Sequence, residues 1–426
     1  MAHNAPHTPI EAKPELVKHY EKKITPKHRY RNPAYDAMVH SLDESLLHED
    51  FMMPQPMKLH WSLGFILSAI CYLLSATPAH AAEIFVGGAT VSITPERPVA
   101  LSGQMHTRIS RAVESPVTAT ALVLESRDGE KVLDQAIMVA CDLVAIPADA
   151  SAKTRERVKK RLPDFPVNKI ILSATHTHTA PVLTEGVYEI PQEGVMQPAE
   201  YIEFFADRAA EAVLKAWEAR KPGKVSWGLG KAVVAHNRRA VYADDTAAMY
   251  GRTNQPNFRM IEGYEDHDVD VLFCWDAQDK LLATAINVPC PAQEVEGRSA
   301  INADFWHPVR ESLRAKYGPD LHVLAWTGAA GDQSPHGMFR QRAEDRMRKL
   351  RGLDRLQDIA RRIVLAWEEA YEGAKQEMHT NVPLIHHVGQ KVMRSARQPG
   401  KSSSTGPLTE STPYGQRRHD ESDSNR

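Results

Sequence analysis

The sequence predicts an α/β domain built on a mixed β-sheet, with flanking helices and active-site loops at strand ends. Segments with the period of strands alternate with segments of helical period between residues 84 and 326. Turn-forming Gly, Pro and Asp residues separate these segments. Two apolar segments, 168–174 and 321–326, run directly into polar loops. Ligands of α/β proteins bind at such strand ends, so these loops are the first candidates for chemistry.

The first half of the domain reads as strands followed by helices. Strands are predicted over 84–94, 117–126, 132–141 and 168–174, with a hairpin at Arg127-Asp128-Gly129-Glu130. A surface helix is predicted after Pro147 through Arg161. Apolar residues at helical spacing predict a second helix over 199–220, which Lys221-Pro222-Gly223 would end.

The second half repeats this alternation. Strands are predicted over 225–235, 269–275, 281–288 and 321–326, with a helix over 304–317. A helical stretch over 341–377, interrupted at Gly352, precedes one further strand candidate over 381–388. Residues 389–426 are rich in Ser, Thr, Gly, Arg and Gln and have the composition of a disordered tail.

The N-terminal region has a different character. Residues 57–81 carry a basic start, an apolar stretch and a small-residue Ala-His-Ala site, as a signal peptide does. We therefore expect residues 1–56 to be a disordered or wrongly assigned extension, and the mature domain to cover 82–388. A signal peptide over residues 57–81 predicts that the protein is secreted or periplasmic. The alternative is a cytoplasmic tail with a signal anchor over 61–76.

Composition excludes several classes of protein. The 426-residue chain is 42% hydrophobic and 25% charged, an ordinary globular balance. A formal net charge of −2, without a basic patch, argues against nucleic acid as a partner. The four cysteines are spaced neither as a zinc ribbon nor as a disulfide framework.

The first candidate site is Thr175-His176-Thr177-His178-Thr179, which follows the predicted strand 168–174. Residues i and i+2 of an extended chain point to the same side, so His176 and His178 would project together. Such a pair suits metal binding or proton transfer. The alternative is a polar strand end whose imidazoles bond to nearby backbone.

The second candidate is the glycine-rich loop 327–337, which follows the strand 321–326. Its small residues allow a close backbone approach to a ligand and leave Asp332, Ser334 and His336 available. It lacks the Gly-Lys-Ser/Thr of a P-loop and the Gly-x-Ser-x-Gly of a nucleophile elbow. The alternative is a plain turn.

These motifs resemble the N-terminal domain of the neutral, or non-lysosomal, ceramidases. Three features occur in that family's order: His106 in a glycine-bearing loop, the Thr-His-Thr-His-Thr-Ala-Pro segment, and Gly331-Asp332-Gln333-Ser334-Pro335. The resemblance covers about residues 84–337. It implies a zinc-dependent amidase that cleaves the N-acyl bond of a ceramide-like lipid to a fatty acid and an amine, and it leaves association with a membrane surface open.

The resemblance also implies roles for particular residues. His106 and His176 or His178 would bind zinc, His178 could instead serve the substrate, and Ser334 and Asp332 would belong to the catalytic loop. Zinc would lower the pKa of a bound water to about 7. The family's glutamate and tyrosine ligands and its immunoglobulin-like domain have no counterpart here, so the chain resembles a truncated member. Glu185, Glu189 or Asp332 could replace the missing carboxylate.

Two alternatives differ in class from the zinc amidase. A metal-free serine hydrolase would use Ser334, with His336 or His178 as its base. A non-catalytic remnant would keep the fold and lack the reaction.

Overall fold

The computed structural model of the chain describes residues 82–389. The predicted extension over 1–56, the predicted signal peptide over 57–81, and the predicted tail apart from Gly389 lie outside these residues. Within 82–389, no helix combines the length and the apolar character that a membrane span requires.

Eight strands form one mixed sheet in the order β12-β11-β10-β5-β1-β2-β3-β4. Their bounds in chain order are β1 Glu83–Ser92, β2 Thr118–Asp128, β3 Lys131–Cys141, β4 Ile170–Ala174, β5 Lys221–Lys231, β10 Asp268–Asp276, β11 Leu281–Val288 and β12 His322–Thr327. The neighbours β3 and β4, and β11 and β12, are parallel, whereas the other neighbouring pairs are antiparallel. The predicted mixed α/β class is confirmed.

Helices connect the parallel strands at both ends of the sheet. Helix α4 (Ala148–Arg161) and the short η1 (Val167–Lys169) lie between β3 and β4, and α6 (Trp306–Tyr317) lies between β11 and β12. A parallel pair needs such a crossover, because its second strand must start again at the same edge. The two edge strands, β4 and β12, therefore end in loops that follow a βαβ unit.

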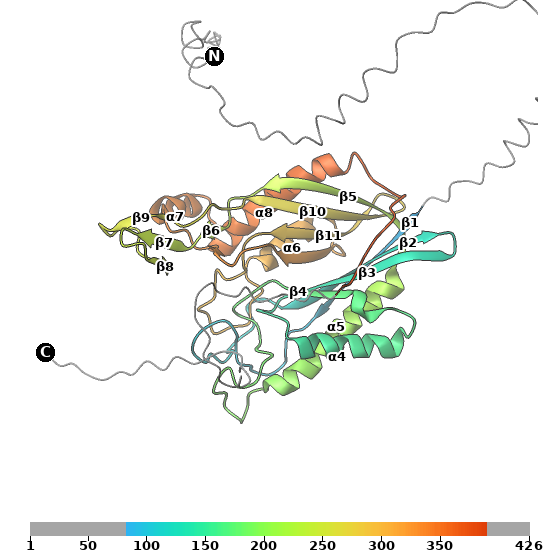
Figure 1. Cartoon of the computed structure of the whole chain (residues 1–426), viewed down its shortest axis with the longest axis horizontal. Helices are drawn as coiled ribbons and strands as arrows, with labels where there is room; N and C mark the ends of the chain where they lie inside the picture. The colour runs from blue at the N-terminus through green and yellow to red at the C-terminus, as the bar shows by residue number, and fades with distance from the viewer. Residues whose placement is uncertain (1–81, 390–426) are drawn as a thin grey trace, which may run out of the picture. The chain divides into compact units, whose positions relative to one another are not determined.

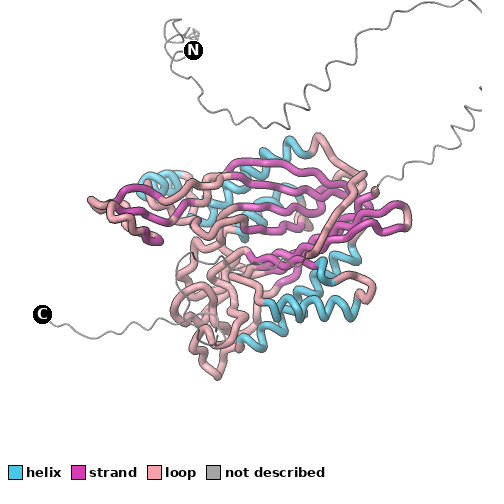
Figure 2. Tube along the Cα trace, viewed as in Figure 1, coloured by secondary structure: helices cyan, strands magenta, loops and turns pink. Residues whose placement is uncertain are grey.

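The sheet folds back on itself, so that its two halves face each other. Strand β12 packs against β2 and β3, and a cluster that includes Val86, Leu122 and Leu324 fills the space between the halves. Helices α4 and α5 (Pro198–Ala219) pack on the β1–β4 half, and α6 and α8 (Arg355–Ala374) on the other. Figures 1 and 2 show these layers, with α4 and α5 outside one half-sheet and α8 along β5 and β10.

Glycine allows α8 to approach β5 closely. A Cβ atom on Gly230 would lie 2.0 Å from the backbone oxygen of Ala366, a distance that no side chain could adopt. Helix α8 begins with a capping box. The Asp354 side chain accepts from the Gln357 backbone N–H, and the Gln357 side chain accepts from the Asp354 backbone N–H. These local features place the long helix flat against the sheet.

The structure differs from the prediction in three places. Strand β5 covers Lys221–Lys231 instead of the predicted 225–235. It begins earlier because Lys221 and Pro222, directly after the helix, already pair with β1. Residues 381–388 form no strand and contribute one bridge, Asn381 with Glu83. Several strands of two to four residues were not predicted, because they are too short to show a period. They are β6 His236–Asn237, β7 Arg239–Tyr242, β8 Ala247–Met249, β9 Phe258–Ile261 and β13 Gln333–Ser334.

One further helix follows the second candidate loop. Helix α7 (Gln341–Leu350) is separated from α8 by a short turn that contains Gly352 in a left-handed conformation. The predicted break at Gly352 therefore divides two helices. The second of these ends at Ala374, three residues before the predicted end.

Candidate active site

The two predicted site segments meet although their strands lie at opposite ends of the sheet order. The carbonyl oxygen of Thr175, just after β4, accepts from the Thr327 hydroxyl at 3.1 Å. The same oxygen accepts from the backbone N–H of Ala292 at 3.1 Å. The ends of β4 and β12 and the loop after β11 are therefore joined at one point.

The two histidine rings face each other at this point. Their ring centroids lie 4.8 Å apart, and their Nε2 atoms are separated by 3.2 Å. His176 has a φ of 63°, so the chain turns at the strand end instead of continuing in extended form. A left-handed conformation is costly for a residue other than glycine and persists where surrounding contacts enforce it.

The partners of the Nδ1 atoms determine where the ring hydrogens lie. His176 Nδ1 is 2.9 Å from the carbonyl oxygen of Val144, which can only accept, so His176 donates. His178 Nδ1 is 3.2 Å from Glu296 Oε2, a contact with the distance of a hydrogen bond but without its alignment. The His176 Nε2 atom therefore carries a lone pair, and His178 Nε2 donates to it at 3.2 Å when His178 holds its hydrogen on Nε2. When His178 holds its hydrogen on Nδ1, the two Nε2 lone pairs are directed at one another. A shared proton or a cation would relieve that repulsion.

The intervening threonines point into the protein. The hydroxyls of Thr177 and Thr179 both donate to the carbonyl oxygen of Asn302 at 2.8 Å, and both residues are fully buried. The alternation of Thr and His therefore separates the buried threonine side chains, which anchor the turn, from the half-buried imidazole rings. This explains why the motif alternates residue types beyond the strand.

The loop of residues 102–108 packs on His178. Arg108 is buried and donates to the carbonyl oxygens of Ser102 (2.8 Å) and His178 (2.6 Å). Gly103 has a φ of 103°, and a Cβ there would lie 2.4 Å from the His178 ring. His106 in the same loop is exposed and makes no hydrogen bond or ion pair within residues 82–389. The structure thus brings the loop to the histidine pair without His106.

Ser334 lies in a polar cluster beside the pair. It is fully buried on β13, and its Oγ accepts from the Tyr250 hydroxyl and from the His336 backbone N–H, each at 3.1 Å. The Tyr250 oxygen in turn accepts from Gln293 Nε2 at 2.9 Å and Arg238 Nη1 at 3.2 Å. Because Ser334 Oγ already accepts twice, its own hydrogen is left to donate to another group.

The other predicted carboxylates are apart from this cluster. The Asp332 side chain accepts from Asn237 Nδ2 and Gln333 Nε2, each at 2.9 Å, and contacts neither histidine of the pair. These hydrogen bonds fix Asp332 directly before Gln333 and Ser334, in the loop that carries Ser334. Glu185 and Glu189 are exposed in the segment after Pro181.

Glu296 joins the histidine pair to the Ser334 loop. One carboxylate oxygen lies 3.2 Å from His178 Nδ1, and the other lies 4.0 Å from His336 Nδ1. His336 Nε2 is held 3.1 Å from the carbonyl oxygen of Glu294, whose carboxylate accepts from Arg355 at 2.8 Å. Polar contacts therefore extend from the histidine pair to the Ser334 loop, with a separation of 4.0 Å between Glu296 and His336.

The charges of the site favour a neutral imidazole next to an ionised carboxylate. Burial lowers the pKa of His176, and the positive potentials of His178 and Arg238 lower it further. The contact with His178 lowers the pKa of Glu296, with smaller contributions from His336 and Arg238, although burial opposes this shift. At neutral pH, Glu296 is charged and His176 is available as a nitrogen ligand or base.

The residues fit a metal ion in part. Two nitrogens on a tetrahedral zinc with bonds of 2.0–2.1 Å lie about 3.3 Å apart, close to the Nε2 separation here. Each ring also has an acceptor at Nδ1, the arrangement usual for metal-binding histidines. A catalytic zinc needs three protein ligands, however, and residues 82–389 contain no group of three His, Cys, Asp or Glu side chains that could hold a metal.

Sequence reasoning missed the four side chains Arg238, Tyr250, Gln293 and Glu296. The first two come from the short strands β6–β8 and their connections, where no motif marked them. Gln293 and Glu296 lie in the loop after β11, and the rule that ligands bind at strand ends would have selected this loop had the parallel pairing with β12 been known.

Comparison of the structure with solved structures finds neutral ceramidases. The crystal structure of neutral ceramidase from Pseudomonas aeruginosa aligns with a TM-score of 0.54 and 18% identity, over 70% of this chain and 46% of that chain. A ceramidase complexed with C2 aligns with a TM-score of 0.52 and 17% identity, over 70% of this chain and 45% of that one. No family model and no curated protein matches the sequence.

The comparison confirms the resemblance inferred from the motifs at the level of fold. The described domain has a neutral-ceramidase-like fold, and the chain spans about half the length of the ceramidases it resembles.

Proposed function

We propose that the chain is an amide hydrolase of neutral-ceramidase type, which cleaves the N-acyl bond of a ceramide-like lipid to a fatty acid and an amine. The observation that carries this proposal is the convergence of two imidazole Nε2 atoms, 3.2 Å apart, beside the Ser334 cluster. The ceramidase-like fold supports the choice of an N-acyl amide as substrate.

Zinc is part of the proposal. His176 and His178 would hold it, and a bound zinc would polarise the substrate carbonyl and lower the pKa of water. The remaining ligands would come from outside residues 82–389, or from His106 after a rearrangement of its loop, because the described residues form no group of three ligands.

The protein's own groups have clear tasks in this reaction. Val144 O and Glu296 orient the two rings so that both Nε2 atoms face the same point. We assign Ser334 as the donor to the amide oxygen, where negative charge develops in the tetrahedral intermediate; because Ser334 is fully buried, its hydroxyl would have to become accessible when the substrate binds. Tyr250 holds Ser334 in this orientation, because its own hydroxyl hydrogen is directed at Ser334 Oγ.

The geometry gives less support to a metal-free serine hydrolase. Such an enzyme needs an imidazole nitrogen within hydrogen-bond reach of the serine oxygen. The Ser334 oxygen instead contacts the Tyr250 hydroxyl and the His336 backbone N–H. Ser334 therefore suits the role of a hydrogen-bond donor better than that of a nucleophile.

The test is hydrolysis of a fluorescent short-chain N-acyl sphingoid base by the purified full chain, before and after chelation and with zinc restored. We expect chelation to abolish turnover and zinc to restore it. His178→Gln should lower kcat/KM by about 10²–10⁴, the range for loss of an acid–base or ligand group. His387→Gln, at an exposed site in the C-terminal segment, should leave kcat/KM unchanged.

Two results would contradict the proposal. Turnover that resists chelation, together with covalent labelling of Ser334 by a serine-reactive probe, would identify a serine hydrolase. A folded, zinc-supplemented chain that hydrolyses no N-acyl amide would identify a non-catalytic remnant.

A further inference from the structure

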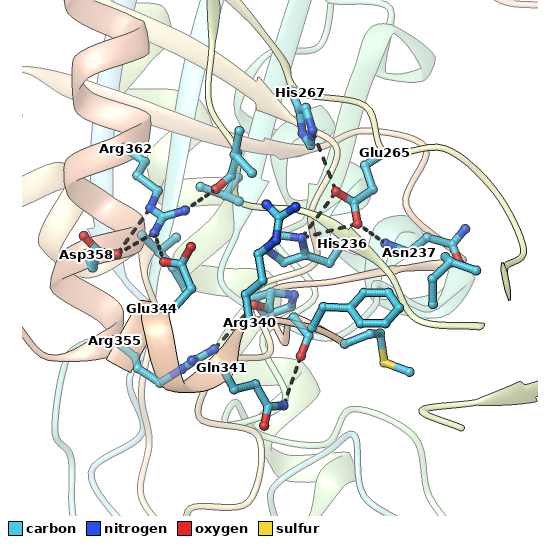
Figure 3. Close-up of a pocket in the computed structure, with 18 of the residues that line it drawn as sticks. His236, Asn237, Glu265, His267, Arg340, Gln341, Glu344, Arg355, Asp358 and Arg362 are labelled. Carbon is cyan, nitrogen blue, oxygen red and sulfur yellow. Dashed lines mark hydrogen bonds and ion pairs between the residues drawn. The ribbon is translucent and has the colours of Figure 1, made fainter. Parts of the chain in front are cut away.

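A large pocket lies next to the Ser334 loop and outside the site described above. Its volume is about 940 Å³, within the range of small-molecule sites. Pro335 and Gly337 line it, and these two residues alternate along the loop with Ser334 and His336. The rest of the lining comes from β6, β9, α7, α8 and the segments beside them (Figure 3).

The acidic groups of this pocket already have partners. Arg362 donates to Asp358 at 2.9 Å and to Glu344 at 2.5 Å, as the dashed lines of Figure 3 show. Glu265 accepts from the Asn237 backbone N–H at 3.2 Å and lies 3.3 Å from His236 Nδ1. Each lining carboxylate therefore already contacts a basic side chain.

One cation of the pocket remains without a partner. Among the four lining arginines, Arg362 is paired as above, Arg355 is paired with Glu294, and Arg348 is paired with Asp345 at 2.5 Å. The Arg340 guanidinium group makes no hydrogen bond or ion pair within residues 82–389, and Figure 3 draws none on it. Arg340 is thus the lining arginine whose guanidinium is free to bind a ligand, and His267 Nδ1 is a second polar atom of the lining without a hydrogen-bond partner in the described residues.

Apolar side chains form another part of the wall. They are Val233, Val234, Ile261, Met338, Phe339 and Ile359. Phe339 is 49% exposed, although its ring packs edge-on against Phe258 at 5.9 Å between centroids. An exposed aromatic side chain beside an unpaired arginine matches a molecule with an apolar chain and an anionic end.

We propose that this pocket binds a long-chain carboxylate, with the carboxylate on Arg340 and the alkyl chain along the wall that includes Phe339. A guanidinium group pairs with a carboxylate through two parallel hydrogen bonds. A single unpaired guanidinium group suits one negative charge better than the two of a phosphate monoester. The choice of a fatty acid rests on the proposed function, because a fatty acid is one product of that reaction.

The test is equilibrium binding of radiolabelled dodecanoate to the full chain, below the micelle concentration of the ligand. We expect saturable binding of one molecule per chain, with affinity falling about fourfold for each methylene removed. Arg340→Gln should weaken binding about tenfold or more, because the charged hydrogen bonds are lost. The matched control is Arg342→Gln on the exposed surface of α7, which does not line the pocket and should change nothing.

Competitors identify the recognised group. Dodecylamine should not displace dodecanoate, and dodecyl phosphate should displace it less well than unlabelled dodecanoate. Equal affinity in the wild type and Arg340→Gln would overturn the proposal, as would tighter binding of the phosphate or the amine.

Dodecanoate binding and amide hydrolysis can be measured independently. The variant His178→Gln should lose hydrolysis while binding dodecanoate normally, since His178 does not line the pocket. Normal binding by a chain that hydrolyses no amide would leave the pocket assignment standing. Hydrolysis without any dodecanoate binding would overturn only the pocket assignment.

Discussion

At the scale of single residues, the candidate site depends on close packing around two rings. Arg108 holds the backbone of His178, and the hydroxyls of Thr177 and Thr179 fasten the same turn to Asn302 O. These buried hydrogen bonds stabilise a turn that contains a histidine in left-handed backbone. The ring positions are therefore set before any substrate or metal binds.

Gly103→Ala tests this packing. The substitution places a methyl group in the His178 ring and forces a side chain into a φ of 103°, which we expect to cost about 1–3 kcal/mol of unfolding free energy. Displacement of the ring should also lower amide hydrolysis by more than about tenfold. Chemical denaturation and kcat/KM measure the two effects.

Gly186→Ala is the matched control, because Gly186 also has a positive φ, of 73°, but has open space around it. It should cost about 1 kcal/mol of stability and leave kcat/KM unchanged. An equal loss of activity in both variants would show that backbone strain alone, and not contact with His178, disturbs the site.

At the scale of elements, the contact between β12 and β1 is a tight one. The His322 ring at the start of β12 lies over Gly88, where a Cβ would approach it to 2.6 Å, and its Nδ1 is 3.0 Å from the Thr90 hydroxyl. Burial lowers the pKa of His322 to about 4, with a further lowering from Arg314. Burial between the two half-sheets therefore favours the neutral imidazole of His322.

Protonation of His322 predicts a pH dependence of stability. The unfolded chain binds this proton near pH 6.5 and the folded chain only near pH 4, so acid favours unfolding between these values. We expect up to about 3 kcal/mol of stability to be lost from this group as the pH falls through that window.

His322→Asn should remove this dependence, because the amide can keep the hydrogen bond to Thr90 without titrating. Urea denaturation of both proteins between pH 7 and pH 4 measures the difference in slope. Parallel pH profiles would show that His322 titrates normally in the folded state.

At the scale of the whole molecule, a buried ion pair connects the two halves of the sheet. Arg310 on α6, which packs on one half, donates to both oxygens of Asp142 at 2.7 and 2.9 Å. Asp142 follows β3 in the other half and also accepts from the Thr118 backbone N–H. The two side chains are 3% and 0% exposed, so neither charge could be solvated if its partner were removed.

Removal of one partner should therefore lower the free energy of unfolding far more than removal of both. Arg310→Met leaves the Asp142 charge buried and should cost about 3–5 kcal/mol. The double variant Arg310→Met with Asp142→Leu should recover part of that loss, since no buried charge remains. Thermal and urea denaturation of the wild type, both single variants and the double variant measure the coupling; additive effects would contradict it.

The same fold-back decides how much of the site could be predicted. His176 and His178 could be identified locally, because an apolar strand followed by alternating Thr and His is visible in a short window. Ser334 was marked by the small residues of its loop. Glu296, Tyr250 and Arg238 carried no local signal, since they join the site only through contacts between segments distant in the chain.

The sequence by itself determined the alternation of strands and helices, the mixed α/β class and the two polar loops after apolar strands. These properties follow from hydrophobic period and turn chemistry, which act over a few residues. Only the tertiary structure decided that the ends of β4 and β12 meet, that Glu296 lies between His178 and His336, and that His106 stays apart. Those relations depend on the folding of the sheet onto itself, and no local pattern specifies that packing.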